Sequence, residues 1–139
     1  MTTLNSRFQS SISQLSRVFG SEIIKQMDGQ ITGTQLYMLY YIREFKRCRL
    51  TELVERMEVK PSAVTVMIDR LEKSDFVKRV SDMNDRRVIL VELTDTGHDI
   101  LRRAQAIRED IVGSYMKKLS TEEAQLVTDI LEKMVRVEQ

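Results

Sequence analysis

Apolar residues recur at intervals of three and four along both ends of this chain of 139 residues, and this periodicity limits the fold more than any other feature. Such spacing places side chains on one face of a helix. With five Gly and one Pro, the sequence also offers few of the chain reversals that a β-sandwich or barrel needs. We therefore expect a mainly α-helical fold. The first stripe comprises Leu4, Phe8, Ile12, Leu15, Phe19, Ile23 and Met27, and the later ones comprise Ile100, Ala104, Ile107, Ile111, Tyr115 and Leu119, then Leu126, Ile130, Met134 and Val137.

Short polar motifs predict where three of the helices begin. In a capping box, a Ser or Thr hydroxyl accepts from the amide three residues later, and a Glu or Gln at that position reaches back to the first amide. The helix that starts near residue 32 loses its apolar pattern in the basic residues 46–49. The capping pairs are Thr32 with Gln35 and Ser120 with Glu123, and Thr94 is a simpler N-cap candidate.

The predicted elements become short in the middle of the chain. Thr51 is expected to cap a two-turn helix over residues 52–57, and residues 58–60 form a turn. Pro61 takes the first position of the next helix, where its fixed φ is favourable and no hydrogen bond is lost. A short helix, a three-residue turn and a longer helix are the helix-turn-helix arrangement. The inward stripe of the second helix is Val64, Met67, Ile68 and Leu71.

Two runs rich in Val and Ile follow, over residues 76–80 and 88–93. The polar residues 81–87 separate them, so we expect a β-hairpin with a charged tip. A hairpin directly after a helix-turn-helix makes a winged helix. The predicted fold is mainly α with a small β-hairpin wing, in which a winged helix-turn-helix core is flanked by dimerisation helices.

The second helix of the helix-turn-helix has an outward face suited to DNA. A major groove is about 12 Å wide, so the leading residues should be short and able to hydrogen bond, as Ser62, Ala63 and Thr65 are. The thinner wing suits the minor groove, where Arg86 and Arg87 would lie in a negative potential. With the cations placed to reach phosphates, the candidate DNA contacts are Lys60, Pro61, Ser62, Ala63, Thr65, Val66, Arg70, Lys73, Lys78, Arg79, Arg86 and Arg87.

Two of the residues in this region need a separate explanation. Asp85 stands beside the wing arginines, and DNA would repel its carboxylate unless it held an arginine through a charged hydrogen bond. We therefore predict that Asp85 supports the wing. Val66 offers only apolar contact, for example with a thymine methyl group.

The apolar stripes at both ends predict self-association. A core of about 50 residues in the middle of the chain cannot cover them, and an uncovered stripe would aggregate. A second copy of the chain would cover them. A two-fold dimer would place its two recognition helices about 34 Å apart, one turn of DNA, and so match a pseudo-palindrome.

Two stretches resemble the MarR family of bacterial and archaeal transcriptional regulators: PSAVTVMIDRLEKSDFVKR, residues 61–79, and DRRVILVELTDTG, residues 85–97. The second stretch, D-x-R, a strand and L-T-x-x-G, is the more diagnostic, and the resemblance spans essentially the whole chain. It implies a homodimer that binds a palindromic operator in double-stranded DNA, more often as a repressor. The implied organisation is a single domain over residues 1–139, with dimerisation helices at 1–30 and 98–139 and a winged helix-turn-helix DNA-binding region at 31–97.

The resemblance also implies roles for individual residues. Many family members have an arginine directly after the threonine that matches Thr65, where this chain has Val66, so the operator sequence stays open. Arg87 would reach the minor groove with Asp85 as its partner. The implied contacts of the recognition helix are Ser62, Ala63, Thr65 and Arg70.

A further implication of the resemblance is a small aromatic effector. Phenolic or aromatic effectors bind family members between the second helix and the dimer helices, which makes Tyr37, Tyr40 and Tyr41 candidates for an effector pocket. An effector that stabilises another spacing of the two recognition helices would lower operator affinity by its differential binding free energy.

Several classes of protein are excluded. No apolar run reaches the roughly 18 residues of a membrane helix. The single cysteine and the lack of a basic-then-apolar leader predict a cytoplasmic protein. The chain has no Gly-rich phosphate loop, H-E-x-x-H motif or nucleophile elbow, so we expect neither an enzyme nor a cofactor. His98 has no second His or Cys at ligand spacing, so no metal site is expected.

Two alternatives stay open from the sequence. The net charge of +1 does not by itself indicate a nucleic-acid partner, so a winged-helix protein-interaction module without DNA binding would also fit. Cys48 could make the chain a thiol-switched regulator if Arg47 and Arg49 lowered its pKa. Thiol-sensing relatives carry their cysteine near the start of the first helix, where this chain has none, so we expect Cys48 to be inert.

Overall fold

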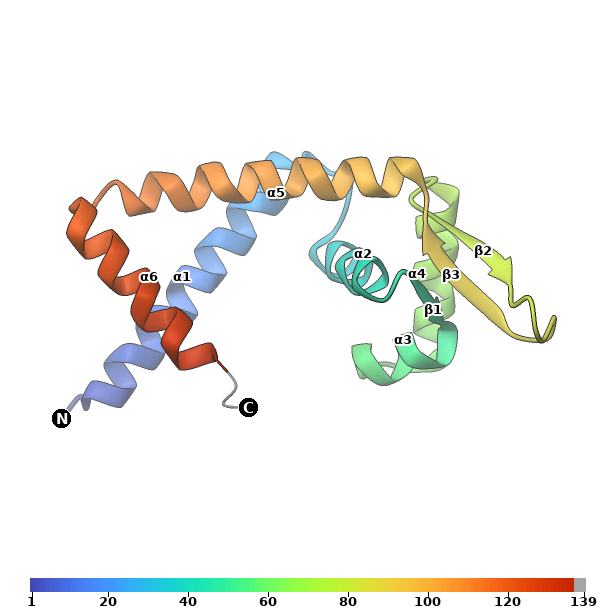
Figure 1. The fold of residues 1–139 in the computed structure, drawn as a ribbon, viewed down its shortest axis with the longest axis horizontal. Coiled ribbons are helices and arrows are strands. Elements are labelled where there is room, and N and C mark those ends of the chain that lie inside the picture. The colour runs from blue at the N-terminus through green and yellow to red at the C-terminus, as the bar shows by residue number, and fades with distance from the viewer. Residues whose placement is uncertain (137–139) are drawn as a thin grey trace.

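The structure is a computed structural model and describes residues 1–136. Its elements are α1 (Leu4–Gln26), α2 (Gly33–Phe45), β1 (Arg47–Arg49), α3 (Leu50–Met57), α4 (Pro61–Lys73), β2 (Val77–Ser81), β3 (Ile89–Leu93), α5 (Asp95–Met116) and α6 (Thr121–Val135). The molecule is elongated along α5 (Figure 1). In this view α1 and α6 lie toward the C-terminal end of α5, and α3, α4 and the sheet gather at its N-terminal end. The expected fold class is confirmed.

Three of the predicted helix starts are confirmed by their cap geometry. The Gln35 amide donates to the Thr32 hydroxyl at 3.2 Å, and the Thr32 amide donates to the Gln35 side chain at 3.1 Å. The corresponding distances for Ser120 and Glu123 are 3.1 and 2.9 Å. The Thr94 hydroxyl caps α5 by accepting from the amide three residues later at 3.0 Å. These caps satisfy amides that a helix start leaves without partners.

The helix-turn-helix forms as predicted. α3 ends at Met57, Glu58 adopts a left-handed conformation with φ of 53°, and Pro61 occupies the first turn of α4. Leu53 of α3 is fully buried. The buried stripe of α4 is Val64, Ile68 and Leu71, each at most 1% exposed. Burial of this stripe turns the opposite face of α4 toward solvent.

The sheet has one strand more than the sequence predicts. The strand order is β1-β3-β2, with both pairs antiparallel, and Cys48 of β1 lies opposite Val91 of β3. Only Cys48 of the three β1 residues is buried. A strand with a single inward side chain has no alternation to detect, which is why the sequence shows only the end of a helix at residues 46–49.

Two predicted helix boundaries are wrong. α3 begins at Leu50, so Thr51 lies inside the helix and does not cap it. Arg49 takes the N-cap position without a side-chain cap, because β1 runs directly into α3. α5 ends at Met116, which leaves Leu119 in the turn before α6.

The outer ends of the apolar stripes are exposed within one chain. Leu4 is 76% exposed, Leu126 60% and Met134 59%, and α6 buries no side chain. The residues of α6 that we expected to face inward therefore find no core in their own chain, and Val137 lies outside the described residues. None of the helices in residues 1–136 has the length and apolar character needed to cross a membrane.

The start of α5 makes a close backbone contact with the segment that leads into β2. The Thr94 amide donates to the Phe76 carbonyl at 3.1 Å, and the Thr94 hydroxyl donates to the Asp75 carbonyl. A Cβ added to Gly97 would lie 2.1 Å from the Phe76 carbonyl oxygen. Glycine is therefore required here by space, which gives the L-T-x-x-G stretch a physical explanation.

We predict that Gly97→Ala destabilises the protein by at least about 2 kcal/mol, because the methyl group must displace backbone atoms. Gly113→Ala is the matched control, since its Cβ would meet nothing within 4 Å in the same helix. That control should be neutral or stabilising by up to about 1 kcal/mol through helix propensity. Urea unfolding followed by circular dichroism measures both, and equal stability of the two variants would contradict the close contact.

Candidate nucleic-acid interface

The leading turn of α4 presents an exposed outward face. Val66 is 47% exposed, which is high for an apolar side chain. The Thr65 hydroxyl donates to the Pro61 carbonyl at 3.1 Å, so its oxygen is left as an acceptor beside an exposed methyl group. The leading turn therefore combines small size, acceptors and apolar surface. The exposed residues are Lys60, Pro61, Ser62, Ala63, Thr65, Val66, Arg70 and Lys73.

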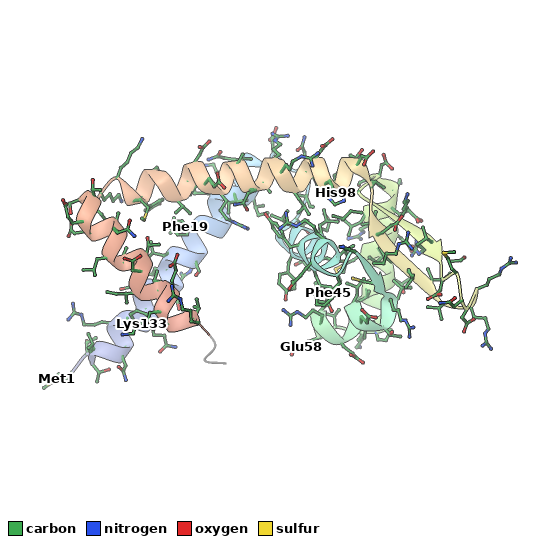
Figure 2. The ribbon with its side chains drawn as sticks, in the orientation of Figure 1. Met1, Phe19, Phe45, Glu58, His98 and Lys133 are labelled. Atoms are coloured by element: carbon green, nitrogen blue, oxygen red, sulfur yellow. The ribbon has the colours of Figure 1, made fainter. Side chains whose placement is uncertain are left out.

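The wing made by β2 and β3 projects from the end of the molecule far from α6 (Figures 1 and 2). Its tip is ordered by its own hydrogen bonds. The Asp82 amide donates to the Val88 carbonyl at 3.0 Å, and the Asp82 carboxylate accepts from the Asn84 amide at 2.8 Å. A thin loop held in this way can present side chains to a groove too narrow for a helix.

Asp85 lies against Arg87, as the sequence predicts. Its Oδ1 accepts from the Arg87 amide at 3.0 Å and from Nε at 3.1 Å, and its Oδ2 accepts from Nη2 at 3.3 Å. These hydrogen bonds, the side-chain ones first, hold the pKa of the Asp85 carboxyl below its usual value. The Arg87 side chain is still 91% exposed. Asp85 therefore orients Arg87 without covering it.

Lys78 and Arg79, the two candidate cations at the root of the wing, form ion pairs within the chain. Lys78 lies 3.3 Å from the Glu92 carboxylate, which also accepts from Arg47 across the sheet at 2.7 Å. Arg47 first and then Lys78 hold the pKa of Glu92 below its usual value. Arg79 is bound by two carboxylates of α4. The candidate cations that pair with no described residue are Lys60, Arg70, Lys73 and Arg86.

Arg49 is a basic residue of this region that the sequence does not identify as a contact. Together with Thr51 and Arg87 it lines a cavity of about 330 Å³ at the base of the wing. The sequence does show its positive charge, as part of the basic run at residues 46–49. Its place beside the wing depends on the pairing of β1 with β3, which has no sequence signal.

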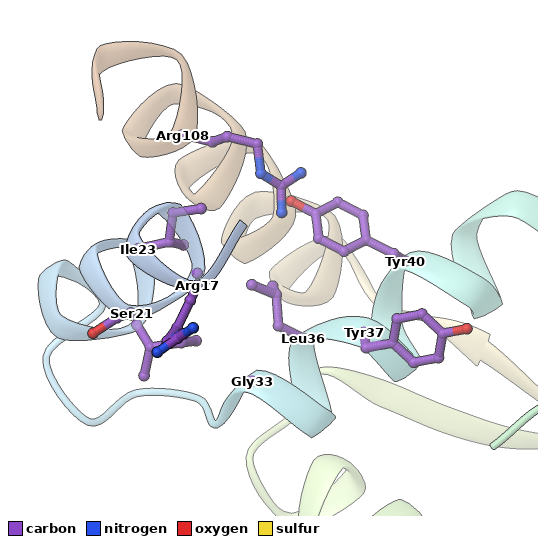
Figure 3. A pocket seen from close by; sticks show the side chains of 10 residues that line it. Arg17, Ser21, Ile23, Gly33, Leu36, Tyr37, Tyr40 and Arg108 are labelled. Carbon is purple, nitrogen blue, oxygen red and sulfur yellow. The ribbon is translucent and has the colours of Figure 1, made fainter. Parts of the chain in front are cut away.

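A larger cavity of about 580 Å³ lies between α1, α2 and α5 and includes Tyr37 and Tyr40 (Figure 3). The Tyr40 hydroxyl is buried and has no hydrogen-bond partner among the described residues. The Arg108 guanidinium lies 5.0 Å from the centre of the Tyr40 ring, and Arg17 of α1 also lines the cavity. The cavity thus offers aromatic surface, two cations and an unsatisfied hydroxyl.

The structure places Tyr41 outside this cavity, which corrects its assignment to the pocket. Its ring lies 4.7 Å from that of Phe45, and the Arg56 guanidinium lies 5.5 Å from the Tyr41 ring centre. One position along a helix turns a side chain by about 100°, so Tyr41 faces α3 while Tyr40 faces α5. Burial, the largest cause, raises the pKa of Tyr41 above its usual value.

Comparison with known proteins identifies the family. Residues 31–89 match the family model described as the MarR family. The HTH-type transcriptional repressor MdtR of Bacillus subtilis is 36% identical over 134 residues, which cover 96% of this chain and 86% of that protein.

Solved structures agree over the whole length. The YusO protein of B. subtilis shares 35% identity with a TM-score of 0.77, covering 97% of this chain and 96% of that one. Wild-type MarR of E. coli in its apo form shares 27% identity with a TM-score of 0.80, covering 98% of both chains. A cysteine-to-serine mutant of E. coli MarR in complex with operator DNA shares 27% identity with a TM-score of 0.63, covering 94% of this chain and 92% of that one.

The remaining candidates for chemistry are structurally unsuited to it. Cys48 is fully buried, and burial, with a smaller effect of Glu52, raises the pKa of its thiol to about 11. Such a thiol is neutral and inaccessible, which argues against a thiol switch. His98 lies on the surface of α5 (Figure 2). Among residues 1–136 no cluster of His, Cys, Asp and Glu could hold a metal ion.

We predict that Cys48 in the native protein at pH 8 reacts with a thiol-specific disulfide reagent at least about a hundredfold more slowly than in urea. Since the folded pKa lies above that of a free thiol, the neutral thiol favours the folded state below pH 9, and this contribution is lost as the pH rises toward 11. The chain has one cysteine, so the absorbance of the released thiol reports on Cys48 alone. Equal rates with and without urea would revive the thiol switch.

Proposed function

This chain belongs to the MarR family, and from that membership we propose that it is a transcriptional repressor that binds a palindromic operator in double-stranded DNA as a homodimer. The observation that carries the proposal is the pairing of a free recognition face on α4 with a wing arginine that is fixed by Asp85 and left 91% exposed. The first suits a major groove and the second a minor groove. We assign no catalytic role and propose that the protein acts in the cytoplasm.

The homodimer is supported by the apolar surface that one chain leaves uncovered. Phe8, Ile12 and Leu15 of α1 are 44, 38 and 41% exposed, and the described stripe residues of α6, Leu126, Ile130 and Met134, are 60, 47 and 59% exposed. Contiguous apolar surface of this kind marks an interface. Two-fold pairing through these helices repeats the recognition helix and wing, and a palindromic site repeats the sequence in the same way.

An effector would act through the cavity between α1, α2 and α5. Those helices connect the proposed dimer interface to the DNA-binding elements, so an occupant that favours one packing of them changes the spacing of the recognition helices. Tyr37 and Tyr40 suit an aromatic ring, and Arg17, Arg108 and the free Tyr40 hydroxyl suit an anionic group on it. We therefore propose a small aromatic carboxylate as the class of effector.

Selection of bound duplexes from genomic DNA by the purified protein tests the proposed function and supplies an operator. The affinity for that duplex should fall with salt, with a slope of about −0.9 per phosphate neutralised, whereas a protein-interaction module would enrich no sequence.

Arg87→Ala should then weaken operator binding by about 1 to 3 kcal/mol, because an oriented groove contact is lost. Lys133→Ala removes the same charge from α6 and should leave affinity unchanged (Figure 2). Equal affinities of the two variants would contradict the role of the wing.

Benzoate serves as a probe of the effector cavity. We expect it to release the selected duplex from the wild-type dimer in a fluorescence anisotropy titration. Tyr40→Phe keeps the ring and removes the hydroxyl, so the half-releasing concentration should rise about tenfold, as expected for a lost hydrogen bond to a charged group. Tyr41→Phe is the matched control on the same helix, outside the cavity, and should behave as wild type. Release that is insensitive to Tyr40→Phe would place the effector elsewhere.

A further inference from the structure

Arg79 sits between the recognition helix and the wing and is bound at both ends of its guanidinium. Its Nη2 donates to the Asp69 carboxylate at 2.5 Å, and its Nη1 donates to the Glu72 carboxylate at 2.8 Å. Both carboxylates belong to α4, whereas Arg79 belongs to β2. One side chain therefore connects two elements that we propose to enter different grooves.

Glu72 makes a second contact that strengthens this connection. Its other oxygen accepts from the backbone amide of Arg79 at 3.2 Å. β2 is an edge strand, so its outward amides have no partner strand. Glu72 thus supplies a hydrogen bond that the sheet does not, and α4 is fixed to the backbone of the wing as well as to a side chain.

The charge of Arg79 is compensated within the chain. Its side chain is 26% exposed, against 91% for Arg87. The hydrogen bond to Asp69 is the largest cause that raises the pKa of Arg79 above its usual value. A guanidinium shared by two carboxylates adds little attraction for a phosphate. The two carboxylates lie on the helix that we propose to face DNA. The phosphates would repel them if Arg79 did not compensate their charge.

We propose that Arg79 is a positioning residue which, through Asp69 and Glu72, fixes the angle between α4 and the wing, so that major-groove and minor-groove contacts form together. The proposal rests on the proposed DNA-binding function and replaces a phosphate contact as the role of Arg79. A fixed angle favours the one duplex on which both contacts fit. Non-specific binding of DNA depends only on charge. It therefore gains nothing from the connection of Arg79 to Asp69 and Glu72, which we call the clamp.

The test uses a charge change for which the two roles of Arg79 predict opposite changes in operator affinity. Asp69→Asn with Glu72→Gln makes the interface of each protomer more positive by two charges and removes both ion pairs of Arg79. If Arg79 is a positioning residue, affinity for the selected operator should fall about tenfold while affinity for a scrambled duplex of the same length rises. If Arg79 contacts phosphate, both affinities should rise, and that result would overturn the proposal.

Glu55→Gln with Glu58→Gln is the matched control, since it removes two carboxylates from the same helix-turn-helix without touching the wing. Both affinities of this control should rise together. Arg79→Lys, which keeps the charge but cannot span two carboxylates, should reduce operator affinity with little effect on scrambled DNA. Full operator affinity in Arg79→Lys would count against the clamp.

Hydrogen exchange of the free protein separates the clamp from the proposed function. In Glu72→Ala, which removes the acceptor, exchange of the Arg79 amide should become at least tenfold faster, with thermal unfolding checked to confirm that the fold persists. This readout needs no DNA, so it judges the clamp even if the wild-type protein selects no operator. Unchanged exchange in that variant would refute the connection between α4 and the wing.

Discussion

The arrangement of this protein depends on the contact between the start of α5 and the residues that precede β2. Thr94 binds two successive backbone carbonyls, those of Asp75 and Phe76, while its hydroxyl also caps α5. Gly97 then lets the helix approach the Phe76 carbonyl too closely for any side chain. This contact fixes the long helix to the end of α4 and the beginning of the wing. The contact joins α5 to the DNA-facing elements, so the orientation of α5 in a dimer sets the position of the recognition helix.

The same contact gives the proposed effector a route from its cavity to the DNA-binding elements. The cavity lies where α1 and α2 meet α5, between the uncovered apolar helices and the winged helix (Figure 3). Leu36 and Tyr40 line it, while Met38, Leu39 and Ile42 of the same helix are buried in the core. A ligand that displaces one face of α2 therefore acts on a helix whose other face is close-packed. Packed helices shift between discrete arrangements more readily than they deform, so the displacement is passed to the winged helix that packs with α2.

The sequence is most informative where structure depends on neighbouring residues. The capping boxes, Pro61 at the start of α4, and the Asp85 to Arg87 contact all join residues within three positions of one another, and all are present. The sequence fails where the determinant is distant. β1 exists only because residues 47–49 meet β3 more than 40 positions away, and the start of α3 shifts with it. The stripes of α1 and α6 are correctly periodic, and their exposure in one chain agrees with the second copy that the sequence predicts, but the sequence does not show how the two copies pack.

Arg79 and Arg87 show how far the same residue type can diverge on one wing. Arg87 has its carboxylate two positions away on the same loop, so the pair is local and the guanidinium stays exposed. The partners of Arg79 lie seven and ten positions away on a packed helix, so its guanidinium is enclosed between two elements. The two arginines carry the same charge, but their geometry differs. It suits Arg87 to contact a groove and Arg79 to hold the wing against α4. With compensated cations at the wing root and a net charge of only +1, attraction for phosphate is limited in each protomer. Selective binding must then come from two copies held in fixed register, which is what a rigid connection between helix and wing provides.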